Sequence, residues 1–320
     1  KKSVGIFGLA SAAGKKINLE NNGTISLKGE GSTGIFASNV ESSSGSGVYT
    51  GVLTDSSIKN TGTITLDAKK TVGIYTPKSN ISKVGNIIMT NNADSSVGVY
   101  LTQEAKADGT GSVIDLNSNS QNQVAYYIKG DGTILNSIGN IKGYGVGVYL
   151  DGTDSTGMAL TTPVQLNAPE LDFVSGNSTK GKGIIGLLLK GNTNISTYTG
   201  GIKVGDSILG GSNVYAIGIY TDEQGTSGTP KPISANVTTG ANGVGLFAEN
   251  SSYITYTGTM SIGNNTTAGT GIYIGNGGDG TKASTVTIDS GADIKLNGVN
   301  GVGAIVTTNA TVNFETGAKI

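Results

Sequence analysis

A short apolar phrase recurs along the whole chain. It consists of a small or β-branched residue, a glycine, an aliphatic residue and a large, mostly aromatic residue, as in VGVY at residues 97–100. The 298 residues from Gly5 to Gly303 hold eleven intervals between such phrases, a mean period of about 27 residues. Sequence repeats of this length are typical of solenoids, in which no single repeat buries its own apolar face. The copies are residues 4–7, 33–36, 46–49, 72–75, 97–100, 124–127, 146–149, 185–188, 217–220, 244–247, 270–273 and 302–305.

A second unit, in which apolar and polar residues alternate, lies between these phrases. It reads NGTISL at residues 22–27 and TGTITL at residues 61–66. An alternation with period two predicts a strand with one buried face. The Asn-Gly or Thr-Gly pair before it is typical of a turn. Weaker copies occur at residues 85–89, 111–116, 257–262, 285–288 and 292–296.

Each period therefore predicts two or three short strands joined by turns, which is one coil of a parallel β-helix. No window keeps an apolar period of 3.6 residues, so the fold class is all-β. We expect residues 1–320 to form one continuous solenoid of about 12 coils, stacked at the inter-strand spacing of about 4.8 Å. Equivalent side chains should then stack, for example Ile25 on Ile64 and Val99 on Ile74. We interpret the chain as a segment of a longer array, since neither end has the composition of a cap.

The repeated phrase also predicts which side chains face outward. Residues two apart share a face of a strand, so we expect Val97 and Val99 to point inward and Gly98 and Tyr100 outward, with the glycine giving the ring room. The rings should form an aromatic ladder that stiffens the rod. The alternative is a stacking platform for sugar rings or for a partner protein. Ten of the 18 aromatic residues occupy this position: Phe7, Phe36, Tyr49, Tyr75, Tyr100, Tyr127, Tyr149, Tyr220, Phe247 and Tyr273.

Insertions fall mainly just after the aromatic phrase, at residues 37–46, 101–111, 150–162 and 221–232. Loops at one phase of a solenoid coil project from one side, which is often the binding side. Tolerated surface variation is the alternative explanation. We expect partner contacts in the loops 101–111, 151–162 and 221–232. The candidate contact residues are Gln103, Glu104, Lys106, Asp108, Asp151, Asp154, Asp222, Glu223, Gln224 and Lys231.

Composition removes several kinds of chemistry. The chain has 53 Gly and no Cys, His or Trp, and its formal net charge is −1. Without His or Cys, neither a Ser-His-Asp nor a Cys-His nucleophilic site can form, and zinc loses its preferred ligands. All 21 basic residues are Lys, so the clustered arginines and net positive charge typical of nucleic-acid binding are absent. No apolar run reaches the roughly 20 residues of a membrane helix. The absence of Cys fits a secreted protein and a cytosolic one equally.

Paired carboxylates are the remaining catalytic possibility, because β-helices can carry glycosidase or lyase sites on a sheet face. Each candidate pair lies in or beside a turn and has no arginine to hold an anionic sugar, which favours solvated turn carboxylates. The glycine-rich stretch at residues 275–280 occurs once and so does not predict a calcium turn. We expect no metal, no cofactor and no enzymatic activity. The candidate pairs are Asp151 with Asp154, Asp222 with Glu223, and Asp289 with Asp293.

The two repeated units, Asn-x-Gly-Thr-Ile-x-Leu and Val-Gly-Ile-Tyr, resemble the passenger repeats of large type V autotransporter adhesins. They are most similar to those of the fusobacterial RadD-like outer-membrane adhesins, and the resemblance covers essentially the whole chain. It implies a right-handed β-helix on the bacterial cell surface, held at the outer membrane by a C-terminal β-barrel outside this segment. It also implies binding to host-cell receptors, to glycans or to other bacteria. The repeat motifs carry no binding residue of the family.

These features predict a monomeric adhesive rod that holds binding loops away from the membrane and adds many weak contacts by multivalency. Two alternatives stay open. One is a β-helical polysaccharide-active enzyme, a lyase or a tailspike-like glycosidase. The other is a passive spacer whose adhesive tip lies elsewhere in a longer protein.

Overall fold

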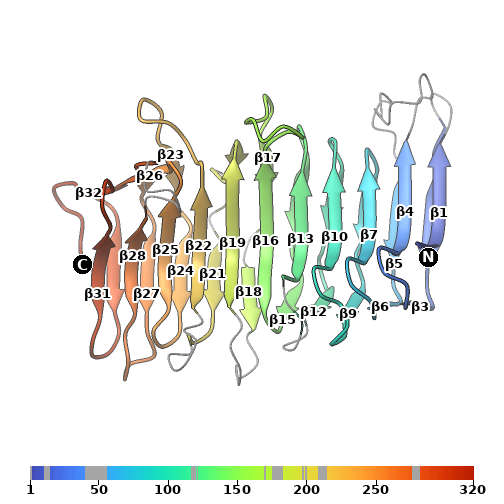
Figure 1. Cartoon of the computed structure of the whole chain (residues 1–320), viewed down its shortest axis with the longest axis horizontal. Coiled ribbons are helices and arrows are strands. Elements are labelled where there is room, and N and C mark those ends of the chain that lie inside the picture. The colour runs from blue at the N-terminus through green and yellow to red at the C-terminus, as the bar shows by residue number, and fades with distance from the viewer. Residues whose placement is uncertain are drawn as a thin grey trace.

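The chain folds into an elongated stack of parallel strands that run across its long axis (Figure 1). This computed structural model describes residues 2–10, 15–39, 56–116, 120, 122–168, 171–174, 183–196, 198, 200–207, 215–275 and 282–320. The described residues contain no helix, and every pairing between named strands is parallel, from Val4 with Thr33 at one end to Ile288 with Phe314 at the other. The predicted parallel β-helix is therefore confirmed.

Three strands per coil build three faces. The first face is a sheet of eleven strands: β1 (Val4–Ala10), β4 (Thr33–Asn39), β7 (Val72–Pro77), β10 (Val97–Thr102), β13 (Val124–Lys129), β16 (Gly145–Gly152), β19 (Ile184–Gly191), β22 (Ala216–Asp222), β25 (Val244–Glu249), β28 (Thr270–Ile274) and β31 (Val302–Val306). The third face has ten: β3 (Thr24–Leu27), β6 (Thr63–Leu66), β9 (Asn86–Met89), β12 (Val113–Asp115), β15 (Asn140–Lys142), β18 (Leu171–Val174), β21 (Gly201–Val204), β24 (Asn236–Thr239), β27 (Thr259–Ile262) and β30 (Asp293–Leu296).

The second face consists of two separate sheets. The first contains β2 (Asn18–Asn21), β5 (Ser57–Asn60), β8 (Asn80–Lys83), β11 (Lys106–Asp108), β14 (Ile134–Ser137), β17 (Val164–Leu166) and β20 (Thr193–Asn194). The second contains β23 (Lys231–Ile233), β26 (Tyr253–Tyr256), β29 (Thr285–Ile288) and β32 (Thr311–Phe314). Within the part of the chain that the structure describes, β20 and β23 are not paired, so the sheet of this face is interrupted between them.

Equivalent residues stack as predicted. Ile25 pairs with Ile64, and Val99 pairs with Ile74. The strand β4 pairs directly with β7, while the predicted phrase at residues 46–49 lies outside the described residues. Side chains such as Val99, Leu101 and Ile114 are fully buried and belong to one continuous apolar core along the axis. Burial at about 25 cal/mol per Å² of apolar surface makes this core the main stabilising element of the rod.

The glycine of the repeated phrase faces the interior, which corrects the prediction. A Cβ atom on Gly98 would lie 2.6 Å from the carbonyl oxygen of Ala125 and 3.2 Å from Cγ2 of Ile114 on the third face. Gly98 and Val99 are both buried, whereas Val97 is partly exposed. Strict alternation is therefore broken at the glycine, and the inward orientation predicted for Val97 is wrong. The glycine allows close approach between coils and between faces, and does not make room for the ring.

The rings form a ladder along the outer side of the first face. One stack runs through Phe7, Phe36, Tyr75, Tyr100, Tyr127 and Tyr149, with centroids 4.8–5.3 Å apart. A second stack contains Tyr220, Phe247 and Tyr273, with centroids 5.1 and 4.6 Å apart. Leu188 separates the two stacks, because it takes the ring position in β19 between Tyr149 and Tyr220. Tyr49 lies outside the described residues.

Neighbouring rings cover each other's faces within each stack. Most of these contacts are close to parallel, as for Tyr75 and Tyr100 at 14°, and only Phe36 and Tyr75 meet edge to face at 61°. A ring inside the stack therefore offers its edge to the outside, not its face. This arrangement supports the ladder interpretation over a platform on which sugar rings stack.

Candidate functional site

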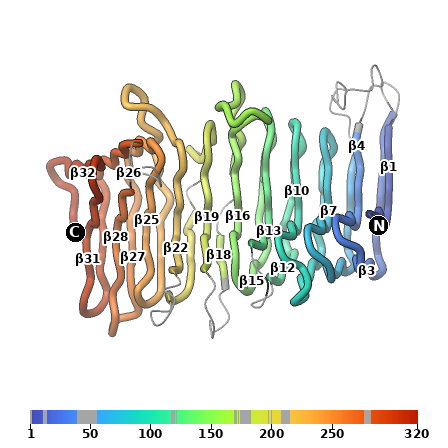
Figure 2. Tube along the Cα trace, viewed as in Figure 1, coloured from blue at the N-terminus to red at the C-terminus, as the bar shows by residue number. Residues whose placement is uncertain are grey.

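Among the residues that the structure describes, two long connections project from one edge of the rod, where the first face meets the second (Figure 1, Figure 2). Residues 153–163 join β16 to β17, and residues 223–230 join β22 to β23. Other described connections at this edge are short, such as residues 78–79, 103–105 and 250–252. Two of the three predicted binding loops therefore correspond to real projections. Their parent strands β16 and β22 are separated by β19 alone, so they lie about 10 Å apart along the axis.

The first projection, residues 153–163, is a small hairpin held by its own hydrogen bonds. Thr153 and Ala159 form an antiparallel bridge, and the Asp154 N–H donates to the Met158 carbonyl at 2.7 Å. The Asp154 carboxylate accepts bonds from the Thr156 N–H at 2.8 Å and the Thr156 hydroxyl at 2.7 Å. These bonds lower the pKa of Asp154. At the tip, Met158 is 68% exposed, so the hairpin presents an apolar side chain to the outside.

The second projection, residues 223–230, is a tighter hairpin. The backbones of Thr226 and Thr229 bond to each other reciprocally, with both N–H to carbonyl distances at 3.1 Å. Their hydroxyls are also bonded, 2.7 Å apart. At the base, the Glu223 carboxylate pairs with Lys282 at 2.9 Å. Both projections are thus ordered by internal contacts, which lowers the conformational entropy that a binding event would cost.

A groove of about 420 Å³ lies between the two hairpins, above the interruption in the second face. The first hairpin contributes Ala159 to its wall. Gly191 and Asn192, at the end of β19 and just after it, also line it. The remaining lining residues come from the second hairpin and β23: Glu223, Gly225, Thr226, Thr229, Pro230, Lys231 and Pro232. The volume lies within the usual range of small-molecule sites, about 300–1,000 Å³.

A row of charged side chains runs beside the aromatic ladder on the outer side of the first face. Asp151 on β16 belongs to this row and is almost fully buried. Its carboxylate accepts bonds from the Tyr127 hydroxyl at 2.6 Å, from the Lys129 ammonium at 2.8 Å and from the Thr153 hydroxyl at 2.6 Å. Burial alone would raise the pKa of Asp151, but the bonds from Lys129, Thr153 and Tyr127 together lower it. Burial and the bond to Asp151 raise the pKa of Tyr127.

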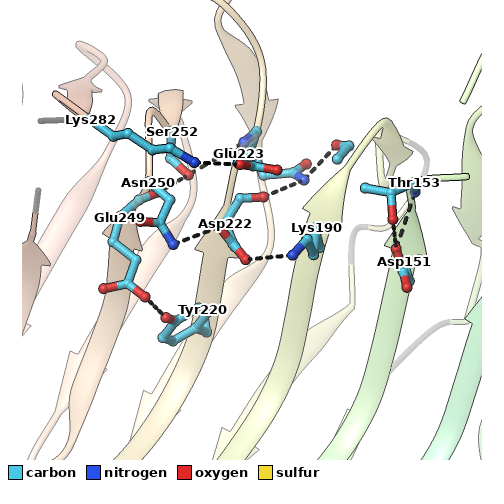
Figure 3. Close-up of polar contacts among 12 residues, drawn as sticks. Asp151, Thr153, Lys190, Tyr220, Asp222, Glu223, Glu249, Asn250, Ser252 and Lys282 are labelled. Carbon is cyan, nitrogen blue, oxygen red and sulfur yellow. Dashed lines mark hydrogen bonds and ion pairs between the residues drawn. The ribbon is translucent and has the colours of Figure 1, made fainter. Parts of the chain in front are cut away.

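The same row continues toward the second hairpin (Figure 3). Asp222 lies between Lys190, at 3.4 Å, and the Asn250 amide, at 2.9 Å. On the next strand, Glu249 accepts a hydrogen bond from the Tyr220 hydroxyl. Burial raises the pKa of Glu249. The predicted residues Asp151 and Asp222 therefore hold neighbouring strands together on the outer face and do not extend from the loop tips.

The third predicted loop, residues 101–111, does not project. Gln103 and Glu104 form a tight turn with positive φ angles of 55° and 67°. Lys106 and Asp108 belong to β11, where Lys106 pairs with Ile134 of β14. Glu104 makes an ion pair with Lys78 at 3.5 Å, and the Asp108 carboxylate accepts bonds from Ser137 and Thr110 that lower its pKa. The insertion is absorbed into the regular coil as a strand of the second face.

Gln224 is fully buried at the interruption in the second face. Its amide oxygen accepts a hydrogen bond from the Thr193 hydroxyl at 2.7 Å, and its amide nitrogen donates to the Gly191 carbonyl at 2.6 Å. Its own carbonyl accepts the Tyr253 N–H at 2.7 Å. The side chain thus bonds to the preceding coil, across the break between β20 and β23, and the backbone bonds to the following coil.

The predicted carboxylate pairs do not share a common site. Asp151 and Asp154 have separate partners, and Asp222 and Glu223 bind Lys190 and Lys282 respectively. Asp289 accepts bonds from Ser290, and Asp293 pairs with Lys295 at 3.3 Å. Among the residues described, no group of three or more acidic side chains could hold a metal ion. The calcium-like stretch at residues 275–280 lies outside the described residues except for Gly275.

Several residues of this site were not predicted as contacts. Met158, Thr226 and Thr229 lie at the two hairpin tips or in the groove, yet the sequence singles out only the charged residues and Gln224 in the same loops. Asn192 is a single residue between β19 and β20 and carries no motif. Only the breaks in the repeat period point toward this region.

Comparisons with known protein families, curated proteins and solved structures found no match to this chain. None of the residues described belongs to a helix long and apolar enough to cross a membrane.

Proposed function

We propose that this chain is the β-helical rod of a cell-surface adhesin, and that it contacts its partner through the hairpins at residues 153–163 and 223–230. The partner would be a receptor protein or glycan of a host cell, or the surface of another bacterium. The likeness of its repeats to autotransporter passengers supports a place outside the cell. Within the rod, the hairpins would contact the partner, and the stacked coils would hold the hairpins away from the membrane.

One observation carries this proposal: the two long projections leave the same edge of the rod and enclose a groove between them. Surface variation alone gives no reason for two insertions in different coils to line the same groove. Both hairpins are held by internal hydrogen bonds, and one of them exposes Met158 at its tip. A rigid loop with an exposed apolar side chain is a favourable contact element, since little entropy is lost when it binds.

The rod allows individually weak contacts to give stable attachment to a partner surface. Stacked coils fix the hairpins relative to one another, and many copies on one cell surface would bind together. Linking weak sites in this way raises the overall affinity by about 10²–10⁴ without any new contact. A site of this size therefore does not need high affinity of its own.

The test is binding of the labelled chain to epithelial cells, to bacterial cells and to a glycan array. The key variants are Met158→Ser and a double deletion of residues 154–158 and 226–229. Ile88→Ser is the matched control, because Ile88 is an exposed apolar residue, at 43%, on β9 of the third face. We expect the double deletion to abolish binding and Met158→Ser to weaken it, with Ile88→Ser unchanged.

Other results would contradict the proposal. Failure of the unaltered chain to bind any cell or glycan would favour a passive spacer. Release of reducing ends from polysaccharides would favour the enzymatic alternative. Binding that survives the double deletion would place the contact surface elsewhere on the rod.

A further inference from the structure

Among the described residues that line the groove, one charged group has no protein partner. Lys231 opens β23 and lines the groove, and its side chain is partly buried. Within the part of the chain that the structure describes, its ammonium makes neither a hydrogen bond nor an ion pair. Burial lowers the pKa of Lys231. A partly buried cation of this kind gains free energy when an anion binds beside it.

The carboxylate that could have paired with Lys231 is already engaged. Glu223 also lines the groove, but its carboxylate is bonded to Lys282 at 2.9 Å. The positive charge of Lys231 therefore remains uncompensated inside the groove. The groove is thus arranged to receive a negative group.

The rest of the groove surface suits a sugar ring. Thr226 and Thr229 supply hydroxyls that are bonded to each other, which leaves one hydroxyl hydrogen available. The side-chain amide nitrogen of Asn192 donates to the carbonyls of Leu160, at 2.8 Å, and Thr161, at 3.5 Å, while its amide oxygen accepts no hydrogen bond from the described residues. Pro232 and Ala159 add apolar wall. Hydroxyls beside apolar patches match the mixed polar and C–H surface of a sugar.

An extended peptide fits this place less well. β23 lies at the edge of its sheet and could in principle accept an added strand. Pro232 lies in the middle of β23 and has no N–H to donate, and prolines at strand edges block such pairing. The groove is also bounded by a hairpin on each side, which suits a compact ligand.

We infer that this groove binds a carboxylate-bearing sugar residue, a uronic or sialic acid, with the Lys231 ammonium as the charge partner. The Thr226–Thr229 hydroxyl pair and the Asn192 amide oxygen bind the sugar hydroxyls. This inference rests on the proposed adhesive function, for which it names the ligand class.

The test is a titration by NMR at millimolar concentrations with methyl glucuronoside and methyl glucoside, which differ only at C6, a carboxylate in the first and a hydroxymethyl group in the second. We expect the glucuronoside to shift signals of Thr226, Thr229 and Lys231, and the glucoside to bind at least about tenfold more weakly. Lys231→Gln should remove this preference, and Lys231→Arg should retain part of it. Lys106→Gln is the matched control, since Lys106 is an exposed lysine on β11, outside the groove. Thermal unfolding of each variant checks that the fold is kept.

Three results would overturn the inference. They are equal binding of the two sugars, unchanged binding by Lys231→Gln, and tighter binding of an acetylated Asp-Glu dipeptide than of the glucuronoside. A cell-binding assay distinguishes failure of the sugar assignment from failure of the proposed adhesive function. If Lys231→Gln still binds cells and the double hairpin deletion does not, the sugar assignment is wrong while the adhesive role stands.

Discussion

The hydroxyl of Thr193 donates a 2.7 Å hydrogen bond to the amide oxygen of Gln224, and both side chains are fully buried. This bond crosses the point where the sheet of the second face is interrupted between β20 and β23. The Gln224 amide nitrogen completes the link by donating to the Gly191 carbonyl at 2.6 Å. One side chain thus replaces part of a missing strand ladder, directly beneath the groove.

Replacing Gln224 by leucine should therefore destabilise the rod. The variant keeps much of the side-chain volume but leaves the Thr193 hydroxyl and the Gly191 carbonyl buried without their partner. Each unsatisfied buried group costs about 1–3 kcal/mol, so we expect the free energy of unfolding to fall by roughly 2–4 kcal/mol. Urea unfolding followed by circular dichroism measures this change.

Gln165→Leu is the matched control for this variant. Gln165 lies on β17, is partly exposed and has no side-chain hydrogen bond in the described part of the chain. Its replacement should change stability by less than about 0.5 kcal/mol. Equal effects of the two substitutions would show that the Gln224 bridge does not stabilise the break.

The glycine of the repeated phrase gives a steric prediction. A Cβ on Gly73 would lie 2.5 Å from the Gly98 carbonyl oxygen, and a Cβ on Gly98 only 2.6 Å from that of Ala125. Gly98→Val should push neighbouring coils apart and lower the melting temperature, with a cost of about 1–3 kcal/mol or more. Gly291→Ala is the control, because a Cβ there meets nothing within 4 Å. A melting temperature unchanged in Gly98→Val would mean that the glycine is not needed for close approach.

Much of the fold could be predicted because the signal is local and repeated. Alternation in residues such as 24–27 and 63–66 marks a strand with one buried face, and the constant period places Ile25 beside Ile64. The orientation of Gly98 could not be read in this way. It depends on the distance to Ala125 in the next coil and to Ile114 on another face, which no local pattern encodes.

The candidate site was predictable only in outline. Insertions in the repeat locate the hairpins at residues 153–163 and 223–230, but the same signal at residues 101–111 marks a segment that becomes the strand β11. Length alone does not tell a projecting hairpin from an added strand. Burial of Gln224 likewise depends on the interruption between β20 and β23, which the sequence does not reveal. The groove exists because the hairpins after β16 and β22 both contribute to its wall, a relationship set by the stacking of the coils.

The lowered pKa of Asp151 predicts that this carboxylate stabilises the fold in a pH-dependent way. Its bonds with Lys129, Thr153 and Tyr127 outweigh the effect of burial, so its pKa is lower in the folded chain than in the unfolded one. The stabilisation is therefore present above the unfolded pKa, about 3.9, and is lost as the pH falls through the lower folded pKa. Asp151→Asn should cost about 1–2 kcal/mol at pH 7, and the difference from the unaltered chain should shrink toward pH 2.

Glu249 is a carboxylate whose pKa shifts in the opposite direction to that of Asp151. Burial raises its pKa in the folded chain, so the ionised form at neutral pH is unfavourable there. Glu249→Gln keeps an oxygen that can accept the Tyr220 hydroxyl and should equal or exceed the unaltered chain in stability at pH 7. Denaturant unfolding of both variants at a series of pH values measures this. Parallel pH profiles for Asp151→Asn and the unaltered chain would contradict the prediction that the ionised Asp151 carboxylate stabilises the fold.

Leu188 interrupts the aromatic ladder, and filling this position should join its two halves. Tyr149 and Tyr220 are the direct neighbours of Leu188 in the sheet, so a ring at position 188 would stack on both. Each aromatic pair contributes about 0.5–1.5 kcal/mol beyond its buried area. Leu188→Tyr should therefore raise the melting temperature.

The reverse substitution inside the intact stack is the matched comparison. Tyr100 stacks on Tyr75 and Tyr127 with centroids 4.9 Å away on each side, so Tyr100→Leu should lower the melting temperature by a similar amount. Near-ultraviolet circular dichroism should change in opposite directions in the two variants, because it reports the coupling of stacked rings. If Leu188→Tyr destabilises the rod, the leucine is needed for the packing of β19 against its neighbours, and continuity of the ladder is not what stabilises this face.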